Sequence, residues 1–403
     1  MALGNRIRRL RKEKNLTLEA LAGDQLTKGM LSLIENDKAQ PSMESLTYIA
    51  EKLGVETNEL LQEVSTSELR DVASQITTFY NQGEYQKVID VVRSKFDGFP
   101  DVFEAGKVLE IYGLSLLETT NPEWDEVIQK ANKIYMAFHD YNASVSLILR
   151  VIQVKITLRD YEQAYDILMK KKEEIMEVGA TIDTLNEVTI KHNEIMLLFA
   201  IDRYHQATEL LEETIDLYRQ KSLFYKIDNL YRVACFYSMM SGKKEKMNHY
   251  MEKLEAYGDF SDHTEIKSYI WIIKAHYYNT YEKNIEKALH SIEKFKETSS
   301  NDPTGGWVNY YVMEKGKSLF WLGEYEEAIS YLEKFNEVPE WTHPFDLSIM
   351  YELYAVMARC YLQLNKIDEA TAYVNKATKG VEDLPPTPYK TFVLDTQKLI
   401  DGE

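Results

Sequence analysis

Apolar residues recur at helical spacing along the first 64 residues and predict a small all-α domain. Within each set they stand mostly three or four positions apart, which is the spacing of one face of an α-helix. The five sets, in chain order, are Leu3, Ile7 and Leu10; Leu18, Leu21 and Ala22; Met30, Leu31 and Ile34; Leu46, Ile49, Ala50 and Leu53; and Leu60, Leu61 and Val64. We expect each set to face one common core.

The second and third of these helices are joined by a short turn. Thr17 and Thr27 each precede a helix, where a hydroxyl can accept a hydrogen bond from an otherwise unpaired backbone N–H. Gly23 and Asp24 end the first helix of the pair. Two short helices in this arrangement form a helix-turn-helix unit, whose second helix can enter the major groove of DNA.

Three short motifs after this turn carry a specific resemblance. They are S-x-I-E-N from Ser32 to Asn36, the pair Pro41-Ser42, and L-x-x-I-A-x-x-L from Leu46 to Leu53. With them, residues 1–64 resemble the five-helix DNA-binding domain of phage repressors of the Cro/C1, or XRE, type. Leu18 and Leu33 depart from that pattern, because relatives often carry polar residues there. The turn is also about one residue shorter than in most relatives. The resemblance implies that Arg11 pairs with Glu35, with a DNA contact as the alternative.

The exposed side of the second helix supplies the candidate base contacts, Lys28, Gly29, Met30 and Ser32. Thr27 is expected to cap this helix and is also a candidate phosphate contact. The further candidates are Lys12, Lys14, Asn36 and Lys38, which either contact phosphates or belong to a solvated basic face. Phosphate contacts position a protein on DNA without specifying its sequence.

The distribution of charge also separates the N-terminal domain from the rest of the chain. The net charge is −18, but residues 1–40 carry +3 and residues 1–64 carry −1, so the rest carries −17. Six basic residues fall in the first predicted helix: Arg6, Arg8, Arg9, Arg11, Lys12 and Lys14. A duplex would attract that end and repel the acidic remainder. We therefore place the nucleic-acid surface in the N-terminal domain alone.

Beyond a predicted linker at 65–70, a motif recurs about every 40 residues from 71 to 384. It reads G-E-Y-E-E-A at Gly323, and in every copy except the one at Lys244 an aromatic or apolar residue is followed three positions later by a small or apolar one. The eight reference positions are Tyr85, Trp124, Tyr161, Tyr204, Lys244, Ile285, Tyr325 and Ile367. A fixed period of this length indicates a solenoid of helical pairs. Residues 385–403, which begin at Pro385-Pro386, are predicted to form a capping helix.

The repeat motif resembles the tetratricopeptide repeat, which implies a right-handed α-solenoid with a concave inner wall. In such repeats the first helix of each pair lines that wall. Counting back from each joint gives ten candidate ligand contacts: Arg150, Gln153, His192, Asn193, Asn229, Arg232, Tyr277, Tyr310, Lys317 and Arg359. The same count places Met196, Phe236, Lys274, Met313 and Glu352 on the inner wall. Amides can bond a peptide backbone and aromatic residues can pack on apolar side chains. The alternative for each residue is helix packing or simple solvation.

The order of the two parts resembles the Rap/Rgg/NprR/PlcR/PrgX quorum-sensing receptors of Gram-positive bacteria. The resemblance implies a cytoplasmic homodimer that binds a palindromic operator and is switched by a short signalling peptide. Asn193 and Asn229 are the residues it assigns to the peptide backbone. The alternative function is a protein-interaction module that controls a phosphorelay response regulator, with DNA binding secondary.

The sequence gives little support for catalysis, for a metal or cofactor site, or for a membrane span. There is no phosphate-binding glycine loop, no H-E-x-x-H and no C-x-x-C, so we predict neither an enzyme, nor catalytic residues, nor a cofactor. The eight histidines show no metal-ligand spacing, and no apolar run reaches the length of a membrane span. Two distant cysteines, Cys235 and Cys360, indicate a reducing compartment rather than a disulfide framework.

Overall fold

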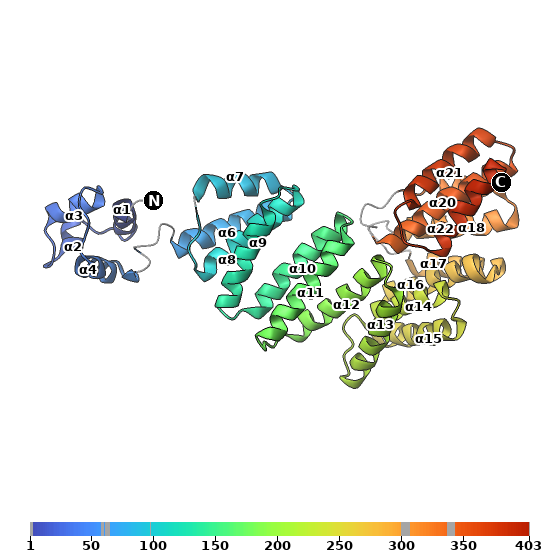
Figure 1. Ribbon diagram of the computed structural model, residues 1–403, viewed down its shortest axis with the longest axis horizontal. Helices are drawn as coiled ribbons and strands as arrows, with labels where there is room; N and C mark the ends of the chain where they lie inside the picture. The colour runs from blue at the N-terminus through green and yellow to red at the C-terminus, as the bar shows by residue number, and fades with distance from the viewer. Residues whose placement is uncertain are drawn as a thin grey trace. The chain divides into compact units, whose positions relative to one another are not determined.

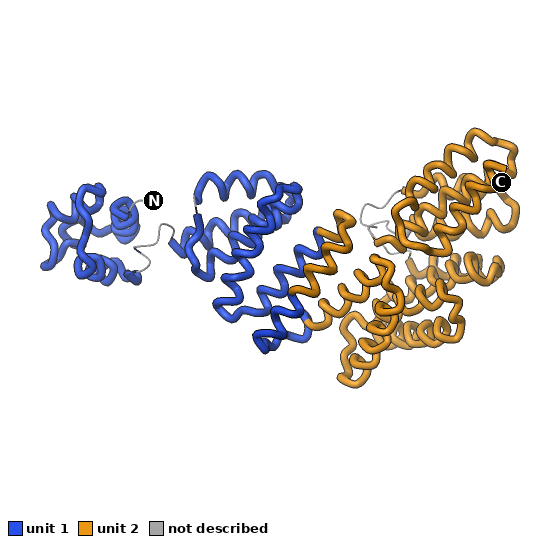
Figure 2. Tube along the Cα trace, viewed as in Figure 1, with its two compact units in different colours: residues 1–154, 171–186 blue, residues 155–170, 187–403 orange. Residues whose placement is uncertain are grey.

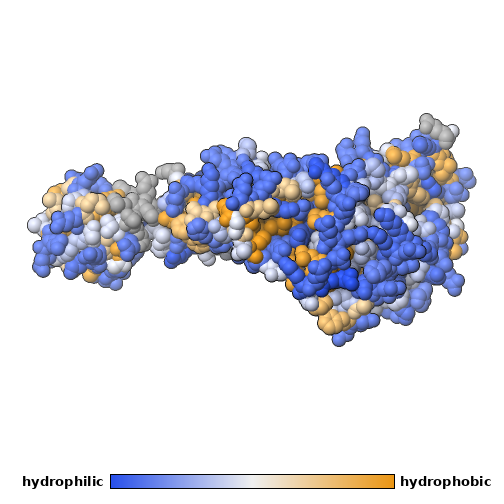
Figure 3. All heavy atoms as spheres, turned by 60° about the horizontal axis from the view of Figure 1, so that its bottom comes forward, coloured by the Kyte–Doolittle hydropathy of each residue, from blue (hydrophilic) through white to orange (hydrophobic). Residues whose placement is uncertain are grey.

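The computed structural model describes residues 3–57, 60, 65–96, 98–299, 307–336 and 343–402 (Figure 1). Within these ranges the chain consists of helices and connecting turns, with no strand. It divides into two compact units, residues 1–154 with 171–186, and residues 155–170 with 187–403 (Figure 2). The face shown in Figure 3 is largely hydrophilic, with apolar residues gathered in separate patches.

The first unit begins with the predicted N-terminal domain. Its helices are α1 (Leu3–Glu13), α2 (Leu18–Ala22), α3 (Lys28–Glu35) and α4 (Met43–Leu53). Thr17 and Thr27 accept hydrogen bonds from the backbone N–H of Ala20 (3.0 Å) and Met30 (3.1 Å), so both predicted caps are confirmed. The buried core contains Ile7, Leu21, Ala22, Leu31, Ile34, Leu46, Ile49, Ala50, Leu53 and Leu60. Leu61 and Val64, predicted for a fifth helix, lie outside the described residues.

The array that follows consists of eight pairs of consecutive helices. They are α6 (Thr66–Asn81) with α7 (Tyr85–Lys95), α8 (Phe103–Glu118) with α9 (Trp124–Ala137), α10 (Tyr141–Thr157) with α11 (Tyr161–Glu177), α12 (Thr184–Ala200) with α13 (Tyr204–Gln220), α14 (Ile227–Met240) with α15 (Lys244–Ser261), α16 (Thr264–Tyr277) with α17 (Ile285–Ser299), α18 (Trp307–Leu322) with α19 (Tyr325–Leu332), and α20 (Pro344–Gln363) with α21 (Ile367–Val381). A π-helix, η1 (Tyr278–Glu282), extends α16, and α22 (Pro388–Asp401) follows the last pair.

Each of the eight predicted reference positions is the first residue of the second helix in its pair. In most pairs the residue two positions earlier has positive φ, for example Gly83 (74°), Gly323 (83°) and Asn365 (57°). At Gly323 the chain makes the bonds of a Schellman turn, from Gly323 N–H to Phe320 O (3.1 Å) and from Glu324 N–H to Leu319 O (3.0 Å). Glycine and asparagine suit this left-handed conformation, so the joint motif encodes the turn itself.

The second pair departs from the common motif, because its close helix contact is made in another way. Its small-residue position is Val127, which is only half-buried, while the next residue, Ile128, is fully buried. Gly113 of α8 faces that side chain, and a Cβ at this glycine would lie 2.7 Å from Ile128 Cδ1. The first helix therefore supplies the small residue that the second helix supplies in the best copies.

Residues 66–70 belong to α6 rather than to a separate linker. The Ser65 hydroxyl accepts a hydrogen bond from Glu68 N–H (3.2 Å) and caps the helix, which therefore starts at Thr66. The polar residues at 65–67 therefore mark the start of a helix. Serine and threonine are common at helix N-caps as well as in linkers, so the composition alone fits either interpretation.

In the second unit, residues near its start in the sequence contact residues near its end. His343 Nε2 lies 3.1 Å from the Met196 carbonyl, and the Tyr204 hydroxyl donates to the Pro386 carbonyl at 3.1 Å. These contacts connect residues 147 and 182 positions apart in sequence. The fourth helical pair therefore meets the segments that flank the eighth, and the intervening first helices are brought around a common interior.

Candidate functional site

The N-terminal end of α3 is the first candidate site. Lys28, Gly29 and Met30 are exposed and Ser32 is half-buried, as a surface that contacts DNA requires. Met30 was also expected on the buried face with Leu31 and Ile34, and this is wrong. Its side chain is 46% exposed, because the buried side of α3 is formed by Leu31, Ile34 and Glu35 and Met30 lies at the edge of that side.

A surface ion pair holds Lys28 in the free protein. Its ammonium lies 2.8 Å from a carboxylate oxygen of Glu19 on α2. A hydrogen bond from Lys28 and its charge lower the pKa of Glu19. Both side chains are largely exposed, so the pair contributes little to stability and Lys28 can exchange this partner for another anion.

The predicted pair of Arg11 and Glu35 is confirmed. Arg11 Nε donates to Glu35 Oε1 at 2.6 Å, and its second donor reaches Oε2 at 2.9 Å. Glu35 is buried, and its hydrogen bond to Arg11 raises the pKa of the arginine. Arg11 is therefore a structural residue that joins α1 to α3.

The position of Arg6 corrects the prediction that all six basic residues of the first helix lie on a basic surface. It is 2% exposed and donates to the Leu60 carbonyl at 2.5 Å, so it belongs to the core of the domain. Arg8 instead donates to Asn36 Oδ1 at 2.8 Å, a contact between helices that the sequence pattern did not indicate. The predicted phosphate contacts Lys12, Lys14 and Lys38 are exposed.

The second candidate site is a cavity inside the second unit, which we call the aromatic cavity. Side chains from α12, α14, α16, α18 and the beginning of α20 line it, so the first helices of five successive pairs contribute. Its aromatic residues are Phe236, Tyr237, Tyr269, Tyr310 and Phe345. The volume is about 180 Å³. This exceeds the ~150 Å³ apolar cavity that admits benzene, so one or two apolar groups of a ligand fit inside.

Two of the ten candidate ligand contacts line this cavity, Arg232 and Tyr310. Arg232 donates to Asn229 Oδ1 at 3.0 Å, and its guanidinium lies 5.0 Å from the ring centre of Tyr269. Asn229 thus stands beside the cavity and orients the arginine. Asn193 lies on α12 and donates to the Thr189 carbonyl at 2.8 Å.

Three other candidates have structural partners instead. Lys317 is 3% exposed and paired with Glu352 at 2.5 Å, so its ammonium is not available to a ligand carboxylate. Arg359 donates to Thr396 at 2.8 Å and packs over the ring of Phe392, both on α22. The Tyr277 hydroxyl donates to Glu282 at 3.2 Å. Lys317 and Arg359 thus bond residues of other helices, and Tyr277 bonds a residue of the π-helix that extends its own helix.

The remaining candidates lie on first helices away from the cavity lining. Arg150 pairs with Glu110, and its guanidinium lies 5.1 Å from the ring centre of Tyr80. Gln153 is exposed on the same helix. Burial, together with the positive charges of Lys226 and Arg232, lowers the pKa of His192 to about 4.

Four polar residues of the cavity were not predicted: His276, Glu314, His343 and Asp346. Burial raises the pKa of Asp346, although His343 and Arg232 act in the opposite direction. Burial also lowers the pKa of His343. His276 lies on α16, Glu314 on α18, and His343 and Asp346 at the start of α20, so no single motif in the chain identifies the group.

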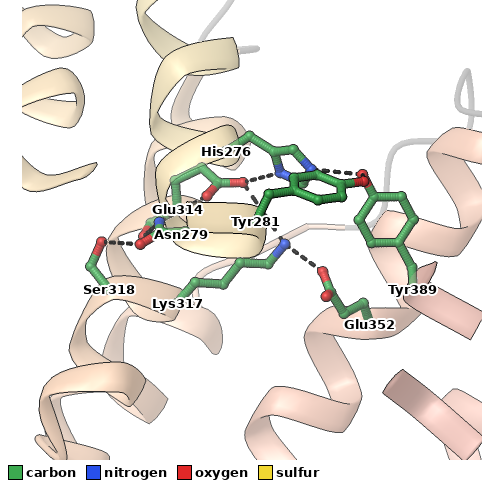
Figure 4. A network of polar contacts seen from close by, with 8 residues as sticks. All are labelled: His276, Asn279, Tyr281, Glu314, Lys317, Ser318, Glu352 and Tyr389. Atoms are coloured by element: carbon green, nitrogen blue, oxygen red, sulfur yellow. Dashed lines mark hydrogen bonds and ion pairs between the residues drawn. The ribbon is translucent and has the colours of Figure 1, made fainter. Parts of the chain in front are cut away.

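A buried polar network forms one wall of the aromatic cavity (Figure 4). His276 lies between Glu314 and Tyr389, at 2.8 Å from each, and Tyr389 comes from α22. Asn279 of the π-helix donates to Glu314 Oε2 at 2.9 Å. Burial alone would raise the pKa of Glu314, but Lys317 and His276 lower it to about 2. The wall is therefore a set of mutually satisfied charges that positions two cavity residues, His276 and Glu314.

Comparisons with known proteins agree with this architecture. Residues 4–65 match the model of a family described as a helix-turn-helix domain. Among solved structures, PlcR of Bacillus thuringiensis in complex with the peptide PapR7 and DNA is 15% identical, covering 66% of this chain and 97% of that one, with a TM-score of 0.33. A search of curated proteins finds no match.

Two further solved structures are similar to this chain at comparable sequence identity. ComR of Streptococcus vestibularis is 19% identical over 79% of this chain and 98% of that one, with a TM-score of 0.24. The PrgX/iCF10 complex is 15% identical over 74% and 96%, with a TM-score of 0.25. The solved structures thus include PlcR and PrgX, two of the proteins that the sequence resembles.

The residues that the structure describes contain neither a membrane-spanning helix nor a metal-binding cluster. No helix there is long and apolar enough to cross a membrane. In the same residues no group of three or more histidine, cysteine, aspartate or glutamate side chains is placed to hold a metal ion. Cys235 and Cys360 are buried free thiols. The chain is thus an all-α protein in which residues 4–65 form a helix-turn-helix domain and a solenoid of helical pairs follows.

Proposed function

We propose that the protein is a transcription regulator whose affinity for operator DNA is switched by a short peptide. One observation carries the proposal. A helix-turn-helix domain with a capped, exposed second helix shares its chain with a solenoid whose first helices enclose an aromatic cavity. The first part has the surface of a DNA-binding module, and the second has space for a ligand's side chains.

The cavity chemistry favours a peptide that presents a large apolar side chain. The lining is mostly aromatic and aliphatic, with Arg232, His276, Glu314, His343 and Asp346 as its charged or titratable members. The remainder of the peptide would lie along the first helices, where Asn229 and Asn193 can bond its backbone. Arg232 can bond a ligand carboxylate from its position beside Asn229.

The switch requires that the peptide bind one arrangement of the repeats better than another. Because α12, α14, α16, α18 and α20 all contribute to the cavity, a ligand there contacts several repeats at once. A change in their packing would alter how two helix-turn-helix domains of a homodimer reach the halves of a palindromic site. The cytoplasm is the compartment in which such a protein meets DNA.

The test is a fluorescence-anisotropy titration of the full chain on duplex fragments of its own gene neighbourhood. Each titration is run with and without synthetic peptides encoded beside the gene. We expect one peptide to change the affinity for one fragment. An absence of sequence preference would contradict the proposal. DNA binding that no peptide affects would favour the alternative, in which the array binds a response regulator.

A matched pair of variants tests the site. Asn229→Ala removes the acceptor that orients Arg232 and should abolish the peptide response while leaving DNA binding by the free protein unchanged. Asn248→Ala, at an exposed position of α15, is the control and should retain the response. Normal peptide affinity of the Asn229 variant by calorimetry would exclude this residue from the site.

A further inference from the structure

The outward side of α3 is apolar, which is unusual for a helix that reads polar base edges. Successive residues of a helix are rotated by roughly 100° about its axis. Relative to the buried Leu31 and Ile34, this places Leu33 and Gly29 on the opposite, outward side, with Met30 at its edge. The side chains of Leu33 and Met30 are 45% and 46% exposed.

Gly29 leaves this apolar surface open. It stands one helical turn before Leu33, and a Cβ built on it would have no heavy atom within 4 Å. A base pair can therefore approach the helix backbone at this point and contact the side chains of Met30 and Leu33. Exposed apolar side chains gain free energy only when a partner with apolar surface covers them.

We infer that Met30 and Leu33 recognise the C5-methyl groups of thymine in the major groove. The inference rests on the proposed function, since it specifies how α3 reads DNA. Within the major groove the thymine methyl is the apolar group that distinguishes one base pair from another. The surrounding residues favour DNA over an apolar protein partner: Lys28 lies in the same helix, and Arg8 and Asn36 lie at its other end.

The polar residues of the site then have complementary roles. Lys28 can leave Glu19 for a guanine edge or a phosphate, because their ion pair is exposed. Arg8 and Asn36 form a bonded pair beside the C-terminal end of α3, where phosphate contacts would fix the orientation of the helix. Sequence preference at the central positions comes from methyl contacts rather than from bidentate hydrogen bonds.

The experiment begins with selection of bound duplexes from a random 30-base-pair library by the full chain. Each thymine of the selected site is then replaced singly by uracil, which keeps every hydrogen-bonding group and removes only the methyl. Burial of one methyl is worth enough to change affinity about fourfold. We expect two or more positions to show a loss of this size in anisotropy titrations.

Variants assign the loss to the two side chains. Met30→Ala and Leu33→Ala should bind the thymine duplex more weakly and lose the sensitivity to uracil at their own positions. Met43→Ala is the matched control, because Met43 is 64% exposed at the start of α4 and should retain the full sensitivity. Circular dichroism confirms that the exposed substitutions leave the fold intact.

The outcomes separate this inference from the proposed function. Selection of a defined site in which no uracil replacement alters affinity would overturn the methyl contacts and leave specific DNA binding in place. Equal sensitivity to uracil in the wild type and in both variants would also overturn the assignment. Failure to select any sequence would reject the inference and the regulator proposal together.

Discussion

Helix α3 and the aromatic cavity differ in how many parts of the chain build them. The outward side of α3 comes from one helix of eight residues, held by a cap at Thr27 and by the link from Glu35 to Arg11. The cavity takes side chains from five helices spread between Met196 and Ile349. A site of the first kind keeps its shape as long as one domain is folded. A site of the second kind depends on the packing of every repeat that contributes to it.

The charges of the two sites differ in the same way. Lys28 and Glu19 are paired at the surface, where the pair can open at little cost. Lys317, Glu352 and Glu314 are buried side by side behind the cavity. Burial alone would lower the pKa of Lys317, but Glu352 and Glu314 raise it. The first arrangement suits exchange of partners with DNA, and the second suits a fixed framework.

The largest predicted effect comes from a substitution that disrupts this buried network of charges. Lys317→Ala leaves Glu352 and Glu314 buried without their cation, and loss of one partner of a buried pair costs about 3–5 kcal/mol. We expect the urea unfolding transition of the array to shift to a markedly lower concentration, measured by circular dichroism. Lys28→Ala, which removes one partner of the exposed pair with Glu19, is the control and should change stability by less than about 1 kcal/mol. Similar losses in both variants would contradict the contrast between the two sites.

A smaller effect is expected in the N-terminal domain. Arg11→Ala removes two hydrogen bonds to the buried carboxylate of Glu35, and a hydrogen bond to a charged group is worth about 1.5–3 kcal/mol. Arg8, at 3.5 Å from Glu35, remains as a partial replacement, so we expect a loss near the low end of this range.

Two affinity measurements on the Arg11→Ala variant separate the N-terminal domain from the aromatic cavity. Operator affinity should fall with the stability of the N-terminal domain, whereas peptide affinity, measured by calorimetry, should be unchanged because the cavity lies wholly in the second unit. Lys12→Ala, at an exposed position of the same helix, should retain the stability of the domain. A fall in peptide affinity in the Arg11 variant would show that the cavity depends on the N-terminal domain.

How much the sequence could predict follows from the same difference. Helix starts and caps depend on residues close in sequence, so local patterns predict them, whereas the Arg11–Glu35 pair was predicted from the resemblance of the domain to XRE-type repressors. The aromatic cavity depends on how far each repeat rotates relative to the last, and no local pattern fixes that angle. Arg232 and Tyr310 were assigned to the wall because their helices were assigned correctly. Lys317 and Arg359 bond Glu352 and Thr396, which come from later helices that the local pattern does not place.

Histidine provides the last of the predicted effects, which is smallest near neutral pH and acts on the array alone. Residues 1–64 contain no histidine, whereas all eight lie in the repeats. Burial, with the charges of Lys226 and Arg232, lowers the pKa of His192 from its model-peptide value near 6.5 to about 4. The unfolded chain therefore binds a proton between pH 6.5 and pH 4 that the folded chain does not, so the folded state loses stability as the pH falls through this range.

At pH 6 this difference amounts to about 1 kcal/mol, and it grows toward pH 4. His192→Gln should flatten the pH dependence of the array's urea midpoint between pH 6.5 and 5, since glutamine does not titrate. His205→Gln is the matched control, because it makes the same substitution at a side chain that is 85% exposed. If the two variants show the same slope as the wild type, His192 does not titrate differently in the folded state. A change in the unfolding of the N-terminal domain over this range would need a carboxylate as its cause, because that domain has no imidazole to protonate.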